Sequence, residues 1–181
     1  IRSIWLHGGD NAKRVLMVAS ASSGEGKTTF ACQLAGSLAR AGRKTILVDC
    51  DIRRPRVHQL LEVPLELGLS EALSDGLQLE TAIHRTRDEN LDVLPAGKIN
   101  DAALQSIARD GAKRVFEQLR NDYEFVIVDS SPILYVADGG AIGKNVDGSI
   151  IVVRSHVSRL PSVAVACQRL EMMGIRSEEQ T

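Results

Sequence analysis

The sequence has few cysteines, almost no net charge and no long apolar run, and each of these absences narrows what it can be. Its 3 cysteines, Cys32, Cys50 and Cys167, are an odd number without metal-site spacing, so we expect reduced thiols rather than a disulfide framework or a zinc site. The formal net charge of −1 gives no support for a nucleic-acid partner. No apolar stretch reaches about 20 residues, so we expect no segment of this sequence to span a membrane. The 181 residues, 44% hydrophobic and 25% charged, suffice for one core, and we expect residues 1–181 to form a single domain.

A glycine-rich stretch follows the first apolar run of the chain, residues 15–19. Over residues 21–28 it reads Ala-Ser-Ser-Gly-Glu-Gly-Lys-Thr, which is the pattern of a phosphate-binding P-loop. Small residues let backbone N–H groups close around phosphate oxygens, while Lys27 supplies a cation and Thr28 a hydroxyl for Mg²⁺. The following segment carries a helical apolar stripe, so the positive end of that helix points at the same phosphates. We therefore expect a nucleoside triphosphate site made by Ser23, Gly24, Glu25, Gly26, Lys27, Thr28 and Thr29. The alternative is a glycine-rich turn without a ligand.

Two further apolar runs end in carboxylates. The run at residues 45–48 leads to Asp49 and Asp51, and the run at residues 125–128 leads to Asp129 in a Walker B pattern. Because strand ends in a parallel sheet face the ligand, and residues i and i+2 project to the same side, Asp49 and Asp51 are placed to share a magnesium ion or a water. The alternative for each aspartate is that it only caps the turn after its strand.

Apolar runs and amphipathic stripes alternate along the chain without repeats or low-complexity linkers. We expect strands near residues 15–20, 45–50, 91–94, 124–129 and 149–154, and helices near residues 28–41, 101–120 and 159–173. Gly111 is a candidate break in the second of these helices. In the last helix, Leu160, Val163, Cys167 and Leu170 are expected to face the core. This order predicts the α/β class, as a three-layer P-loop NTPase fold with a mostly parallel central sheet and helices on both faces.

The three motifs, in this order, resemble those of the bacterial tyrosine kinases, the cytoplasmic ATPase-like domains attached to exopolysaccharide and capsule export systems. Residues 20–29 look like that family's Walker A, residues 46–55 (ILVDCDIRRP) like its Walker A′, and residues 125–132 like its Walker B. Residues 68–73 and 91–97 also look like signatures of the family. The Asp-x-Asp-x-Arg-Arg-Pro ending of Walker A′ is the most specific of these signals, because the related MinD and ParA ATPases lack it.

The resemblance implies a role for each residue of the site and a setting for the domain. Lys27, Asp49, Asp51 and Asp129 would carry the catalysis, with ATP and Mg²⁺ as cofactors. Lys27 and Thr28 would hold the β- and γ-phosphates and the metal. Asp51 and Asp129 would also organise the metal. Asp49 would orient or deprotonate a tyrosine hydroxyl. The domain would be cytoplasmic, at the inner face of the cell membrane through an upstream segment. Besides ATP or ADP, its partner would be a membrane-anchored activator or a polysaccharide co-polymerase domain.

Two departures from the family pattern concern assembly. The only tyrosines are Tyr123 and Tyr135, and the C-terminal tyrosine cluster that is the family's usual autophosphorylation site is missing. Arg2 is followed by Trp5 where the family's oligomerisation motif has a second arginine, so we do not expect a closed ring, while self-association of another kind stays open. The first residue is not Met and the family's next strand is lacking at the other end, so we expect a fragment of a longer chain, with a remodelled C-terminal end as the alternative.

We expect an ATP-dependent protein-tyrosine kinase domain that regulates exopolysaccharide or capsule biosynthesis or export. One alternative is a regulatory ATPase switch of the MinD/ParA type, and Ser22 argues against it because those proteins carry a signature lysine at that position. A second alternative is a nucleotide-binding scaffold without kinase activity. The complete set of Lys27, Thr28 and the aspartates argues against a scaffold.

Overall fold

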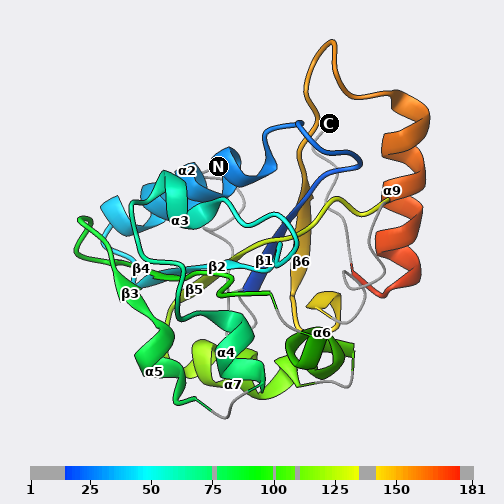
Figure 1. Ribbon diagram of the computed structural model, residues 1–181. Helices are drawn as coiled ribbons and strands as arrows, with labels where there is room; N and C mark the ends of the chain where they lie inside the picture. The colour runs from blue at the N-terminus through cyan, green and yellow to red at the C-terminus, as the bar shows by residue number, and fades with distance from the viewer. Residues whose placement is uncertain (1–14, 75–76, 100, 109–110, 135–141, 176–181) are drawn as a thin grey trace.

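The computed structural model of the protein describes residues 15–74, 77–99, 101–108, 111–134 and 142–175. These residues form a three-layer α/β arrangement around a six-stranded sheet with the strand order β3-β4-β2-β5-β1-β6 (Figure 1). The strands are β1 (Val15–Ala19), β2 (Thr45–Asp49), β3 (His84–Arg85), β4 (Leu91–Leu94), β5 (Phe125–Asp129) and β6 (Gly148–Ile151). The helices are α2 (Lys27–Arg40), α3 (Val57–Leu60), α4 (Leu69–Ser74), α5 (Leu79–Ala82), α6 (Asp101–Ala108), α7 (Ala112–Asp122) and α9 (Leu160–Met172).

The sheet is parallel except at one edge, where the short strand β3 runs antiparallel to β4. Every residue of β1, β2 and β5 is buried, because helices cover both faces of the central strands. Parallel strands end on the same side, so the segments that follow β1, β2 and β5 meet at one edge of the sheet. The P-loop and both carboxylate motifs are those segments.

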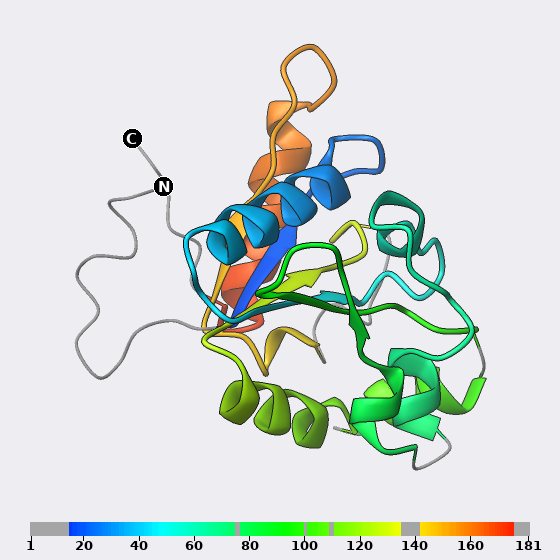
Figure 2. The same cartoon turned by 90° about the vertical axis from the view of Figure 1, so that its left-hand side faces the viewer.

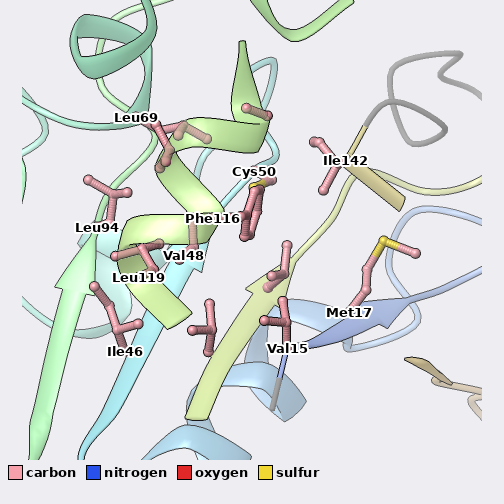
Figure 3. Packing of buried hydrophobic residues seen from close by; sticks show 14 of the residues in the cluster. Val15, Met17, Ile46, Val48, Cys50, Leu69, Leu94, Phe116, Leu119 and Ile142 are labelled. Carbon is pink, nitrogen blue, oxygen red and sulfur yellow. The ribbon is translucent and has the colours of Figure 1, made fainter. Parts of the chain in front are cut away.

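The side chains of the central strands alternate between two hydrophobic cores. On β1, Val15 and Met17 belong to one core, and Leu16 and Val18 belong to the other. The first core lies under α4, α5, α7 and α9, and Figure 3 shows Phe116 and Leu119 of α7 packed against side chains of the sheet. The second core lies under α2 and α3, on the opposite face (Figure 2). The sheet is thus the middle layer of three.

The predicted strands and long helices are confirmed, with boundaries that differ by a few residues. The segment predicted as one helix at 101–120 is two helices, α6 and α7, and Gly111 lies at the N-terminus of the second. The core-facing position predicted for Leu160 is wrong, because this side chain, at the start of α9, is 80% exposed. Four elements were not predicted, namely β3, α3, α4 and α5, since two to six residues are too few for a periodic pattern. In the described part of the chain, no helix combines the length and the apolar character that crossing a membrane requires.

Candidate nucleotide-binding site

The P-loop has a backbone that fits a phosphate group. Gly24 and Gly26 have φ angles of 86° and 92°, in the left-handed region that residues with a Cβ rarely adopt. Gly26 precedes α2 and no side chain caps this helix, so its first N–H groups are available to an anion. A Cβ built on either glycine meets nothing within 4 Å, so the requirement for glycine is conformational. Open space and unpaired N–H donors are what a bound phosphate needs.

A buried ion pair joins the P-loop to the end of β5. Lys27 Nζ lies 2.6 Å from Asp129 Oδ1, and both side chains are buried. Burial raises the pKa of the Asp129 carboxyl, against the opposing effect of the Lys27 charge. The second oxygen, Asp129 Oδ2, is buried and has no hydrogen-bond partner among the described residues. An unpartnered buried acceptor is costly unless a ligand engages it, so this oxygen is a candidate contact to a metal-bound nucleotide.

Asp49 organises the loop that follows β2. Its Oδ1 accepts a hydrogen bond from the Asp51 N–H at 3.1 Å, and its Oδ2 accepts from the N–H groups of Arg56 at 3.2 Å and Val57 at 3.1 Å. The side chain is buried at the paired position opposite Asp129. Burial, and then the charge of Asp129, raise the pKa of Asp49 to about 7. The carboxyl group therefore fixes the Walker A′ turn while it stays close to the ion pair.

Asp51 is more accessible than Asp49. It is half-buried, and its Oδ1 accepts hydrogen bonds from Ser131 Oγ at 2.8 Å and from the Arg54 N–H at 3.3 Å. Of the three aspartates of the site, it is therefore the one that is not fully buried.

The remaining predicted residues lie on the P-loop and in the first turn of α2. Ser23 and Thr29 are exposed on the loop and on the first turn of α2, and Thr28 is half-buried, with its Oγ1 3.4 Å from Lys27 Nζ. Glu25 is buried and its carboxylate turns back into the loop, where Oε2 accepts from the Ser22 N–H at 2.7 Å. The Glu25 side chain thus stabilises the conformation of the P-loop through a hydrogen bond within the loop.

Two residues near the site were not predicted from the sequence. Arg154, in the segment after β6, donates from Nη1 to the Gly24 carbonyl oxygen at 3.2 Å. Ser131 donates to Asp51. A lone arginine outside a motif gives no sequence signal, but Ser131 had one, because it follows Asp129 at the same spacing at which Asp51 follows Asp49.

The donor set suits magnesium held together with phosphate. Within the described ranges, no three His, Cys, Asp or Glu side chains are grouped closely enough to hold a metal ion by themselves. Magnesium is usually held by one or two carboxylates together with substrate phosphates and waters, so a complete protein cage is not required. Thr28, Asp51 and Asp129 are the residues that would hold it here, beside the phosphate-binding loop.

Two thiols lie near the site, and their surroundings disfavour the thiolate form. Burial raises the pKa of Cys32 to about 12, and burial and the neighbouring aspartates raise the pKa of Cys50 well above its ordinary value. The expected suppression of the Cys50 thiolate is confirmed. Arg2, Trp5 and Tyr135, on which the expectations about assembly depend, lie outside the described residues.

The chain matches known proteins over most of its length. The family model described as an AAA domain matches residues 13–165. The tyrosine-protein kinase YwqD of Bacillus subtilis is 33% identical over 161 residues, which cover 89% of this chain and 68% of that protein. The tyrosine-protein kinase Etk of Escherichia coli is 31% identical over 166 residues, which cover 92% of this chain and only 23% of Etk. The chain therefore spans about a quarter of the length of Etk.

Solved structures agree with this relationship. The kinase domain of Escherichia coli Etk superposes with a TM-score of 0.88 at 30% identity, covering 93% of this chain and 66% of that one. The septum site-determining protein MinD of Pyrococcus horikoshii, solved with Mg-ADP, superposes with a TM-score of 0.78 at 25% identity, covering 91% and 67%. The fold is thus that of the P-loop NTPases, and the chain belongs to the AAA-domain family and, within it, to the bacterial tyrosine-protein kinases.

Proposed function

We propose that this chain is an ATP-dependent protein-tyrosine kinase domain that regulates exopolysaccharide or capsule biosynthesis or export. The observation that carries the proposal is the buried pair of Lys27 and Asp129 at 2.6 Å, which joins an open P-loop to a Walker B strand beside Asp49 and Asp51. Membership of the tyrosine-protein kinase family supports it. Phosphoryl transfer depends on positioning and on charge neutralisation, and this cluster of charges beside an anion-binding loop offers both.

Each site residue has a proposed role. The backbone of Ser23, Gly24, Glu25, Gly26, Lys27, Thr28 and Thr29 holds the phosphates, Lys27 neutralises their charge, and Thr28, Asp51 and Asp129 hold Mg²⁺. Mg-ATP, when bound, supplies the transferable phosphoryl group and a metal charge that stabilises it.

Asp49 has two candidate roles, and the structure offers a reason for each. Its hydrogen bonds to Asp51, Arg56 and Val57 suit a residue that orients the site. A pKa of about 7 suits a group that accepts the proton of a tyrosine hydroxyl near neutral pH. The variant Asp49→Asn is expected to lower kcat more than nucleotide affinity in both cases, and loss of an acidic limb from the pH profile of kcat identifies the proton acceptor.

The setting of the domain is also proposed. From the resemblance of its motifs to those of the bacterial tyrosine kinases, we infer a cytoplasmic domain at the inner face of the cell membrane, attached through an upstream segment. Its partner would be a membrane-anchored activator or a polysaccharide co-polymerase domain. The net charge of −1 favours no nucleic-acid partner.

The test uses radiolabelled ATP with Mg²⁺ and a random copolymer of glutamate and tyrosine as substrate. An added substrate is needed because Tyr123 is only 8% exposed and its hydroxyl donates to Asp92 Oδ2 at 2.7 Å. Transfer of label to tyrosine, lost in Lys27→Met and retained in Lys113→Met, supports the kinase. Lys113 is a matched control because it is exposed on α7, away from the site.

A second candidate, a regulatory ATPase switch, is favoured by the similarity to MinD with Mg-ADP. Release of inorganic phosphate without labelled tyrosine in the same assay supports the switch over the kinase. Binding of nucleotide with neither product supports a scaffold instead.

A further inference from the structure

The strand register places Ser131 beside Asp51. In the parallel pair of β2 and β5, Asp49 lies opposite Asp129, and the Cys50 N–H continues the pairing by donating to the Asp129 carbonyl oxygen at 2.8 Å. Side chains alternate along extended backbone, so the residues two positions further on, Asp51 and Ser131, project on the same side as that pair. The sheet thus brings a hydroxyl and a carboxylate together at its carboxyl edge.

The contact engages one carboxylate oxygen and leaves the other open. Ser131 Oγ donates to Asp51 Oδ1 at 2.8 Å, and the Arg54 N–H donates to the same oxygen at 3.3 Å. Within the described ranges, Asp51 Oδ2 accepts no hydrogen bond. A carboxylate held through one oxygen has a fixed plane, and its second oxygen then has a defined direction.

The segment that carries Ser131 is itself fixed to the P-loop. On one side of Ser131, the Ser130 hydroxyl donates to the Val18 carbonyl oxygen at 2.9 Å. On the other side, the Ile133 N–H donates to the Ser20 carbonyl oxygen at 2.9 Å. Val18 and Ser20 lie at the junction of β1 and the P-loop. The Ser131 hydroxyl is therefore held relative to the P-loop, whereas Asp51 lies on the turn after β2.

We propose that Ser131 is a positioning residue, whose hydroxyl holds the Asp51 carboxylate in the orientation needed to bind Mg²⁺ with a nucleotide. The inference rests on the proposed function, because it assigns Asp51 to the metal. Ser131 links the carboxylate of Asp51 to the P-loop, so that the distance and orientation of Asp51 relative to the P-loop are maintained. Asp51 without this bond keeps its charge but rotates, and its contribution to metal binding falls.

The expected effects separate positioning from general stability. Replacing Ser131 with Ala removes one hydrogen bond to a charged group, so we expect about a tenfold loss in Mg²⁺-dependent nucleotide affinity. Binding measured in EDTA should be unchanged, since the P-loop contacts do not involve Ser131. In turnover, we expect kcat to fall more than KM rises.

The test measures binding of a fluorescent ADP, N-methylanthraniloyl-ADP, during a Mg²⁺ titration and in EDTA. The variants are Ser131→Ala, Ser131→Thr, which keeps the hydroxyl, Asp51→Asn, and the double variant of Ser131→Ala with Asp51→Asn. Ser37→Ala is the control, because Ser37 is exposed on α2. A positioning role predicts rescue by Thr, no effect of Ser37→Ala, and no further loss from Ser131→Ala once Asp51 is Asn. If the Ala variant fails to fold, Ser131→Cys, which has a similar volume and only a weak donor, takes its place.

The outcomes distinguish this inference from the proposed function. Additive effects of the two substitutions, or equal losses with Mg²⁺ and in EDTA, would overturn the assignment of Ser131 even if the wild type phosphorylates tyrosine. Coupled effects in Mg-ADP binding without any tyrosine phosphorylation would overturn the kinase and support Ser131. A wild type that binds no Mg-ADP would overturn both.

Discussion

At the scale of single residues, the site is built from charges that are costly to bury. Lys27 and Asp129 are both removed from water, and a buried ion pair gives little net stability compared with apolar packing. Asp49 is buried nearby with a raised pKa. A cluster of buried ionisable side chains with shifted pKa values is typical of functional sites, where a bound ligand compensates their charge.

Lys27→Met is expected to remove most of the stabilisation that nucleotide gives. At a ligand concentration near 100 times Kd, a protein that binds only when folded gains about 2.7 kcal/mol. The measurement is the shift in Tm with saturating Mg-ADP, taken within each variant because loss of Lys27 also leaves Asp129 without its partner and lowers the starting Tm. Lys113→Met should keep the full shift. A wild type whose Tm does not respond to Mg-ADP would contradict the assignment of the loop.

The raised pKa of Asp49 makes stability depend on pH. The pKa of Asp49 is about 7 in the folded state and 3.8 ordinarily, so the folded protein binds the proton more tightly than the unfolded chain does. The resulting contribution of Asp49 to the free energy of unfolding is fully present below about pH 4 and is lost as the pH rises through about 7. Asp129, whose pKa is also raised, acts in the same direction. In urea unfolding without nucleotide and with EDTA, the free energy of unfolding should fall between about pH 5 and pH 7 more steeply for the wild type than for Asp49→Asn. The difference in slope is expected to approach about 1.4 kcal/mol per pH unit. Equal slopes for the two proteins would show that Asp49 keeps its ordinary pKa in the folded state.

At the scale of elements, backbone hydrogen bonds and close backbone packing form a junction between α4 and the end of β4. The N–H groups of Leu69 and Ser70 donate to the carbonyl oxygens of Pro95 and Ala96, at 2.8 Å and 3.0 Å. A Cβ on Gly68 would meet backbone atoms of Pro95 and of the glycine at position 97. The two signatures at 68–73 and 91–97 therefore form one structural unit. Because β4 is parallel to β2, the loop after β4 lies at the same sheet edge as the site.

Gly68→Ala is expected to destabilise the fold by about 3 kcal/mol, because the added methyl group collides with backbone that cannot rotate away. Gly42→Ala is the matched control. Gly42 has a φ of 78° with open space around it, so only its left-handed conformation matters, at about 1 kcal/mol. The measurement is the urea midpoint at constant m-value. Equal losses in the two variants would mean that the junction can open to admit a side chain.

At the scale of the whole molecule, two cores on opposite faces of the sheet hold the strand ends in register. The sheet edge that carries the site is therefore packed on both faces, while the turns above it combine buried residues such as Glu25 and Ser130 with exposed ones such as Ser23. Rigid strands with functional turns are a common arrangement in α/β proteins. The tyrosine of the described region, Tyr123, belongs to the core and not to these turns.

The isolated domain is expected to show no closed ring and little autophosphorylation. Tyr123 is buried and hydrogen-bonded to Asp92, and Trp5 stands where the family's oligomerisation motif has an arginine. Light scattering over a range of protein concentrations should give no discrete ring. A phosphotyrosine blot after incubation with Mg-ATP should be faint. A discrete ring, or a strong signal mapped to Tyr123 or Tyr135 by mass spectrometry, would contradict this expectation.

The sequence by itself determined the strands, the long helices and the P-loop, because each depends on neighbouring residues. Continuous apolar runs predict strands buried on both faces, and the glycine pattern predicts the left-handed turns at Gly24 and Gly26. The tertiary structure decided which side chains meet. Lys27 and Asp129 are 102 positions apart, and Asp51 and Ser131 are 80 apart, so their contacts depend on the placement of β5 between β1 and β2. Strand order results from packing of the whole chain and cannot be predicted from a local sequence pattern. For the same reason, only the tertiary structure could show that Leu160 is exposed.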